Sequence, residues 1–125
     1  MTMELGQEFS LQYAFGWDEP IAGPVQQAIS MYGNDEDRIR LAGHFSVSRE
    51  SLEAMADVPT PEVQLAVAAN PATPVEALAK MASDRSRFVR AAALNAIEQL
   101  PGQQRDAAKA MMGSVVQRLR SRLSA

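Results

Sequence analysis

The sequence repeats itself at a 26-residue interval, and this repeat limits the possible folds more than any other feature. Asn34, Thr60 and Ser86 are separated by this interval, and each stands directly before a short stretch with apolar residues at helical spacing. These residue types are favoured at helix N-caps because a side-chain oxygen accepts a hydrogen bond from a free N–H of the first turn. A repeated unit of this length indicates a solenoid, in which short helices stack on one another.

Proline and asparagine mark the ends of short helices along the chain. Pro24, Pro61 and Pro74 stand at expected first helical positions, where the missing proline N–H has no intrahelical partner anyway. Asn70 ends a helix because the following Pro71 pushes it out of helical geometry. These signals predict helices at about 24–31, 35–43, 49–57, 61–69, 75–83, 87–99 and 103–123. Most are shorter than the ~12–15 residues that an isolated helix needs, so packing between units must stabilise them.

The sequence around Thr73 predicts a capping box. In this motif the Thr73 hydroxyl and the Glu76 carboxylate each accept a hydrogen bond from the other residue's backbone N–H. Thr73 would then be the N-cap of a helix with Leu78 and Met81 on its inward face. Met55 shares the repeat phase of Met81, so we expect both methionines to fill the core.

Residues 1–23 differ from the repeats, because apolar and polar residues alternate there as in an extended strand. The alternating apolar residues are Phe9, Leu11, Tyr13, Phe15 and Trp17. Leu5, Phe9 and Tyr13 also fit one face of a helix, so both strand and helix remain open. We interpret the segment as an atypical cap over the apolar end of the repeat stack. The alternative is a docking surface in which the aromatic residues contact a partner.

A final helix over residues 103–124 is interpreted as a C-terminal cap. Its apolar residues recur at helical spacing and form an amphipathic stripe. They are Ala108, Met112, Val115, Leu119 and Leu123. Arginines at positions 118, 120 and 122 lie near its end, where cations suit the helix dipole. The alternatives are a dimer seam and an interfacial membrane helix. The lack of aromatic residues argues against the membrane helix.

The run from Val63 to Ala82 combines an apolar helix, an Asn-Pro-x-Thr-Pro turn and a second helix that ends in Met-Ala. This pattern resembles the leucine-rich repeat variant family. The next unit reopens with Phe88-Val89-Arg90, a start that is similar to the family pattern. The preceding unit, residues 39–57, is a less regular copy with His44-Phe45 at the place of Asn70-Pro71. The resemblance covers roughly residues 35–98, is strongest over 61–94, and does not extend to 1–23 or 103–125.

This resemblance implies a right-handed superhelix of short helices, related in architecture to HEAT and armadillo arrays. It also implies an interaction scaffold and brings no catalytic residue with it. Some family members carry a cysteine-ligated iron–sulfur domain, which a chain without cysteine cannot form. The second element of each family unit can be 3₁₀-like. The 26-residue interval is slightly longer than the family's usual unit, so α geometry is the other possibility here.

Few residues in the chain can support catalysis or bind a cofactor. The absence of cysteine excludes disulfides, thiolate metal sites and cysteine nucleophiles. His44 is the only histidine and occupies the repeat position of Asn70, so we expect a turn or capping role. The acidic run 35–37 follows the Asn34 cap, where carboxylates meet the helix dipole favourably, and this role outweighs hard-metal binding. No catalytic motif occurs, so we predict no enzymatic activity, no cofactor and no metal.

Charge is distributed unevenly along a chain whose net charge is −3. Residues 1–62 carry eleven Asp or Glu and three Arg, whereas residues 63–125 carry four Asp or Glu and nine Lys or Arg. This asymmetry allows head-to-tail self-association. Arg38, Gln64 and Arg90 are equivalent in the repeat and should form a row, with Arg85 and Arg87 adding a basic cluster. Such a row can grip phosphates, although the net acidity argues against nucleic acid.

We therefore predict a single all-α domain, a right-handed superhelical solenoid of short helix pairs over residues 24–99 with caps at 1–23 and 103–124. Its expected function is a non-catalytic protein–protein interaction module that binds another protein or a second copy of itself. The candidate partner-binding residues are Phe15, Trp17, Arg38, Arg87 and Arg90. A nucleic-acid-binding helical-repeat protein is the alternative. No apolar run could span a bilayer and no secretory signal is visible, so we expect a cytoplasmic protein that is not in the membrane.

Overall fold

The computed structural model describes the backbone of residues 16–124 and the side chains of residues 16–113. Within this range the chain forms α-helices and no strands. The helices are α2 (Gly23–Tyr32), α3 (Asp35–Ala42), α4 (Arg49–Ala56), α5 (Pro61–Ala69), α6 (Val75–Met81), α7 (Arg87–Glu98) and α8 (Gly102–Ser124). Their bounds lie close to the expected ones. The second element of each unit is α-helical rather than 3₁₀.

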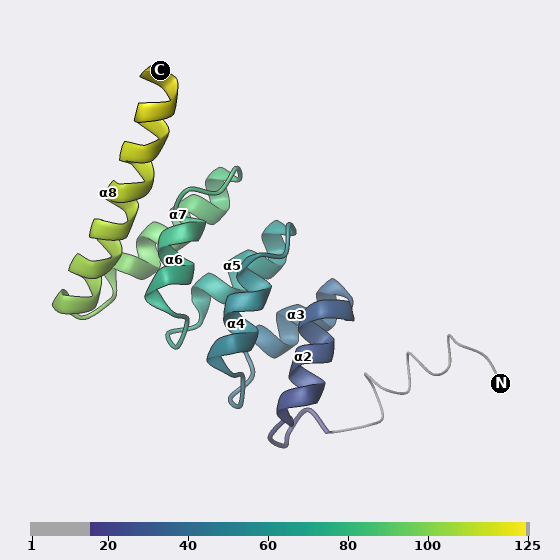
Figure 1. Ribbon diagram of the computed structural model, residues 1–125. Coiled ribbons are helices and arrows are strands. Elements are labelled where there is room, and N and C mark those ends of the chain that lie inside the picture. Colours follow the sequence, from purple (N-terminus) through teal and green to yellow (C-terminus); the bar gives the residue numbers. More distant parts are fainter. Residues whose placement is uncertain (1–15, 125) are drawn as a thin grey trace.

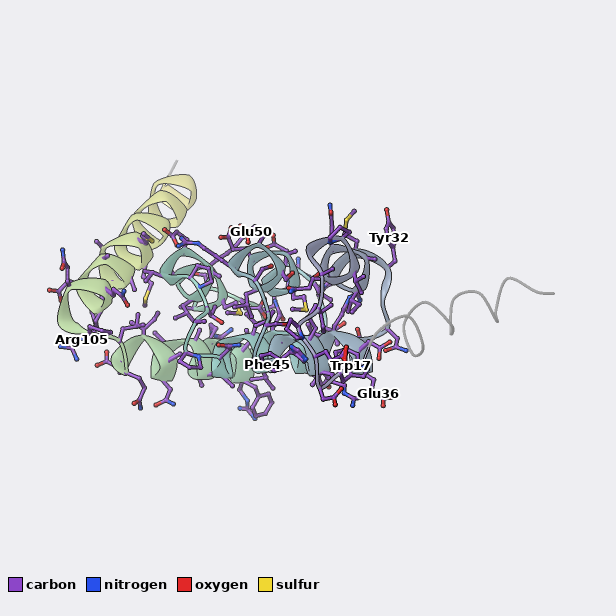
Figure 2. The ribbon with its side chains drawn as sticks, turned by 90° about the horizontal axis from the view of Figure 1, so that it is seen from below. Trp17, Tyr32, Glu36, Phe45, Glu50 and Arg105 are labelled. Carbon is purple, nitrogen blue, oxygen red and sulfur yellow. The ribbon has the colours of Figure 1, made fainter. Side chains whose placement is uncertain are left out.

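The helices lie in two layers (Figures 1 and 2). One layer holds α3, α5 and α7, and each of these packs on the next in the series. The other layer holds α2, α4, α6 and α8, which also contact in that order. The chain passes from one layer to the other at every turn. Helices that are two apart in sequence therefore lie side by side, as a repeated helix pair requires.

The core runs between the two layers and is built from equivalent positions. Ile29, Met55 and Met81 are related by the repeat interval and are all at most 1% exposed. Leu41 and Val67 form a second such series in the other layer, and both are fully buried. The sequence prediction that the methionines fill the core is confirmed. Each helix presents one apolar stripe inward, so the repeat interval in the sequence becomes a continuous buried seam.

Two of the three predicted caps make their side-chain hydrogen bond. Asn34 Oδ1 accepts from the Asp37 N–H at 2.8 Å, and Ser86 Oγ accepts from the Val89 N–H at 3.4 Å. Thr60 occupies the N-cap position of α5, but its side chain makes no capping hydrogen bond. The reason is local. A capping bond would need the Val63 N–H, and this group donates to the Thr60 carbonyl instead, at 3.1 Å.

The predicted capping box at Thr73 is wrong. Helix α6 has Pro74 as its N-cap, so Thr73 lies one residue too early to cap it. The buried Thr73 hydroxyl donates instead to the Val67 carbonyl near the end of α5. The Glu76 carboxylate contacts Arg49 of α4 at 3.3 Å. Thr73 therefore stabilises the end of the preceding helix rather than the start of the next one.

The two ends of the chain are described in part. Trp17 packs against the core and Ile21 is buried within it, whereas Phe15 and the rest of the alternating segment lie outside the described residues. At the other end, Ala108 of α8 is fully buried and Met112 packs against the core, with α8 contacting α6 and α7. The remaining stripe residues of α8 lie outside the described side chains. None of the described helices combines the length and the hydropathy needed to cross a membrane.

Candidate binding grooves at the turn edge

One edge of the molecule is formed by the turns that leave α3, α5 and α7, and we call it the turn edge. Asn70 holds two of these turns together. Its Nδ2 donates to the Ala42 carbonyl at 2.7 Å, and its Oδ1 accepts from the Ala72 N–H at 2.8 Å. The first bond joins neighbouring units and the second shapes the local turn. A turn residue with an amide side chain can do both, because it carries a donor and an acceptor.

His44 makes the same kinds of contact one unit earlier. Its Nδ1 accepts from the Ser46 N–H at 3.1 Å, and its Nε2 lies within hydrogen-bond distance of the Trp17 carbonyl. Because Nδ1 must accept, Nε2 carries the proton and donates to that carbonyl. The expected turn role of His44 is confirmed, and the side chain is only 9% exposed.

A buried glutamine beside this turn escaped the sequence analysis. Gln26 Nε2 donates to the carbonyls of Ile21 and Ser46, both at 2.9 Å. Its Oε1 accepts from the Ser48 N–H at 2.8 Å and from the Ser51 hydroxyl at 3.0 Å. All of its donors and acceptors are therefore used, which a polar group that is 4% exposed requires. Gln26 holds the first turn in place beside His44.

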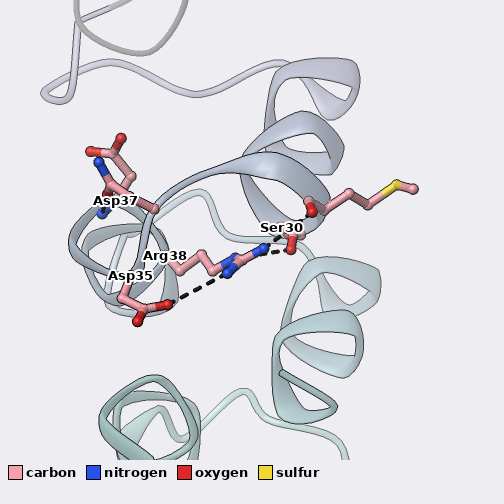
Figure 3. Close-up of polar contacts among 6 residues, drawn as sticks. Ser30, Asp35, Asp37 and Arg38 are labelled. Carbon is pink, nitrogen blue, oxygen red and sulfur yellow. Dashed lines mark hydrogen bonds and ion pairs between the residues drawn. The ribbon is translucent and has the colours of Figure 1, made fainter. Parts of the chain in front are cut away.

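The predicted row of Arg38, Gln64 and Arg90 exists, but it points into the protein. Arg38 donates to the carbonyls of Ser30 and Met31, each at 3.1 Å, at the end of α2 (Figure 3). Gln64 donates to the Ala56 carbonyl at 3.1 Å, at the end of α4. Arg90 donates to the Asp84 and Arg85 carbonyls, at 2.8 and 3.0 Å, just after α6. Arg38 and Gln64 thus pair carbonyls that helix C-termini leave free, and Arg90 pairs carbonyls of the turn between α6 and α7.

These contacts change what the arginines offer to a ligand. Arg38 donates from all three guanidinium nitrogens within the chain, and its side chain is only 16% exposed, whereas Arg90 uses Nη1 for its two bonds to the chain. Arg87 is exposed on α7, with its guanidinium carbon 5.1 Å from the ring centroid of the exposed Phe88. A phosphate backbone would therefore meet Arg87 on this helix, whereas Arg38 and Arg90 are used structurally.

The acidic run at the start of α3 lies beside this row. Burial raises the pKa of the Asp37 carboxyl, the neighbouring Glu36 raises it further, and Arg40 opposes both effects. Arg38 contacts Asp35 at 3.5 Å. Among the side chains that the structure describes, no three His, Asp or Glu residues come together in a way that could hold a metal ion.

Two adjacent grooves lie along the turn edge. The first groove, about 330 Å³, runs between the end of α3 and the end of α5. The second groove, about 680 Å³, runs between the ends of α5 and α7. They share Ala69, Asn70 and Pro71. Within the described chain, neither groove is lined by a Lys, Arg, Asp or Glu side chain.

The second groove is the first groove moved by one repeat unit. Ala66 lines the first groove, and its equivalent in the next unit, Ala92, lines the second. The same interval relates Phe45 of the first groove to Pro71 of the second. Sequence analysis could not find these grooves, because a groove depends on how much volume neighbouring side chains leave empty.

Aromatic residues gather where the first groove begins. Phe45 is 70% exposed and its ring stacks on His44 with centroids 4.5 Å apart. Trp17, a predicted partner-binding residue, also contacts His44, at a centroid distance of 6.0 Å. The Arg40 guanidinium carbon lies 4.5 Å from the Trp17 ring centroid. Figure 2 shows Trp17 and Phe45 near each other at this edge.

The opposite edge carries a polar depression of about 480 Å³. Its lining includes Asp57, Lys80, Asp84 and Arg85. Lys80 pairs with Asp57 at 2.6 Å across the two units, and both side chains are more than half exposed. Such an exposed ion pair contributes ~0–1 kcal/mol. This edge has charged side chains in its lining, which the grooves of the turn edge lack.

Two layers of short equivalent helices, joined by equivalent turns, define an all-α helical repeat protein. Comparison with family models supports this assignment, because residues 61–86 match the model described as leucine rich repeat variant. The matched segment contains α5 and α6 and ends at the N-cap of α7. The resemblance seen in the sequence is thereby confirmed over this unit. Neither the curated proteins nor the solved structures gave a match.

Proposed function

We propose that this protein is a non-catalytic interaction module, an adaptor, inhibitor or scaffold, that binds a protein partner along the turn edge. In this proposal the repeats form a right-handed superhelical solenoid, closed by residues 1–23 and by α8, and the protein acts in the cytoplasm. The match to the repeat variant family supports the helical-repeat part of the proposal. Helical repeats form extended surfaces that suit protein recognition.

The observation that carries the proposal is the pair of equivalent grooves. Their lining is apolar or neutral, and an exposed Phe45 lies beside them. Exposed apolar patches rimmed by polar groups are typical of protein-binding sites. A binding surface for phosphates would instead need cations along the groove. Of the predicted contact residues, Trp17 lies at the head of this edge, and Arg87 would contact a partner only from α7.

The proposal can be tested by affinity capture from a native lysate with the full tagged chain. Phe45→Ser removes the exposed aromatic residue at the first groove, and Phe88→Ser is a matched control on α7. We expect a nuclease-resistant protein partner that the wild type and Phe88→Ser retain and that Phe45→Ser loses. Capture that disappears with nuclease, or that falls steeply as salt is raised, would instead support nucleic-acid binding. Equal recovery by both variants would refute a site at the turn edge.

A further inference from the structure

Trp17 occupies, in the first unit, the place that the two grooves occupy in the later units. Trp17, Gly43 and Ala69 are equivalent by the repeat interval. The Trp17 ring contacts Arg40 and His44. The equivalents of these two residues in the next unit, Ala66 and Asn70, line the first groove. The indole therefore fills the position that remains open one unit further along.

The grooves are open because the equivalent residues are small. A Cβ atom built on Gly43 has no neighbouring atom within 4 Å, so there is empty space where Trp17 carries its side chain. Gly43 has φ −97° and ψ 4°, a bridge-region conformation that non-glycine residues also adopt in turns. Ala69 contributes only a methyl group to the edge shared by both grooves. The series of Trp17, Gly43 and Ala69 thus contains one filled position followed by two open ones.

We propose that residues 1–15 of this chain occupy the open grooves and insert aromatic side chains there as Trp17 does in the first unit. The segment joins the described chain at Gly16, directly beside the filled position. Its apolar residues alternate with Ser10, Gln12 and Ala14, so in an extended segment they share one side. This inference does not depend on an external partner, but it concerns the same grooves as the proposed function, and it assigns residues 1–15 to these grooves rather than to a cap over the end of the stack.

The length of the segment and its tether favour binding within one chain. Neighbouring helices pack ~8–10 Å apart, which about three extended residues span. Tyr13 and Phe9 stand four and eight positions before Trp17, so they reach the first and second grooves. A short tether gives an effective concentration on the order of millimolar, above that of a second chain in dilute solution. An external partner would have to displace the segment before it could use the same grooves.

The experiment replaces Tyr13 by the photo-cross-linker p-benzoylphenylalanine in the full chain and maps the cross-links by mass spectrometry. We expect cross-links within one chain to residues 43–47 or 66–72, with a yield independent of protein concentration. Cross-links to α2 or to the opposite edge would overturn the proposal. Cross-links between two chains that increase with concentration would also overturn it, in favour of a second copy.

A variant with a filled first groove is compared with a variant that carries the same added side chain elsewhere. Gly43→Trp places an indole in the first groove and should lower the cross-linked fraction about tenfold, because burial of an aromatic side chain favours docking by that factor or more. Gly113→Trp adds the same side chain on α8, where a Cβ also meets no atom within 4 Å, and should leave the yield unchanged. If Gly43→Trp does not fold, as judged by circular dichroism, Ala69→Trp fills the second groove instead, and its effect is measured with the cross-linker at position 9. Unchanged yields in a folded groove variant would refute the inference.

Discussion

At the scale of single residues, the fold depends on polar side chains that join one unit to the next. Asn70 and His44 are different chemically, yet each supplies one donor and one acceptor to nearly equivalent partners. This explains why a histidine can replace the asparagine of the repeat. Such side chains are structural even though their residue types are common in active sites.

We expect Asn70→Asp to destabilise the protein by about 1–3 kcal/mol, because the donor to the Ala42 carbonyl is lost while the acceptor for Ala72 is kept. Asn95→Asp on the exposed side of α7 is the control and should change stability by less than about 0.5 kcal/mol. Urea unfolding followed by circular dichroism measures both. If the two variants have equal midpoints, the tie between units contributes nothing.

Thr73→Val should destabilise by about 1 kcal/mol, because the buried hydroxyl no longer donates to the Val67 carbonyl. The cost is limited, since that carbonyl also accepts from the Asn70 N–H at 3.1 Å. Thr73→Ser keeps the hydroxyl and should retain the hydrogen bond. A melting temperature for the valine variant at or above that of wild type would contradict this role of Thr73.

At the scale of helices, the ends matter as much as the apolar faces. Arg38 and Gln64 each reach back to the end of a preceding helix in the other layer, and Arg90 reaches the turn that follows α6. Short helices leave a large share of their carbonyls unpaired, so a repeated donor at one position serves every unit. The same row that suggested phosphate binding is therefore explained by the needs of the helix ends.

Arg38→Ala should lower the free energy of unfolding by about 1.5–3 kcal/mol, because two hydrogen bonds from a charged donor to the end of α2 are lost. Arg87→Ala removes the same side chain from an exposed position and should stay within about 0.5 kcal/mol of wild type. Thermal unfolding of the two variants at equal ionic strength makes the comparison. Equal losses would show that Arg38 acts only as a surface charge.

The helices could be predicted from the sequence because caps, prolines and apolar spacing are local signals. The structural role of Gln26 could not be predicted from the sequence, because its four hydrogen-bond partners lie on segments that meet only in the folded chain. The sequence predicts the wrong helix end for Thr73, because a one-residue shift of the start of α6 changes the hydrogen-bond partner of its hydroxyl. The grooves could not be predicted from the sequence either, since they follow from the small size of Gly43 beside residues one unit away.

At the scale of the whole molecule, each unit is held mainly by its neighbours. Helix α5 packs on α3 and α7 in its own layer and on α4 and α6 in the other, whereas α2 and α8 each have neighbours on one side only. A stack of this kind does not have to unfold as one body, because its stability is a sum of units and interfaces.

We therefore expect hydrogen exchange under native conditions to be slowest in α5 and faster in α2 and α8. The reason is that opening an end unit breaks one interface, while opening the centre breaks two. Exchange measured by mass spectrometry on the intact chain resolves these helices. The same protection in all helices would mean that the chain opens only in one cooperative step.

The ties that join successive units also determine how the chain would respond to a pulling force. Asn70 bonds to Ala42 and His44 to Trp17, so each tie closes a loop of about one repeat. Breaking one tie and its interface would release one unit, which corresponds to ~90 Å of extended chain at ~3.4 Å per residue. Tension applied at the ends would thus lengthen the molecule in steps, and each step would remove a groove that depends on two intact units.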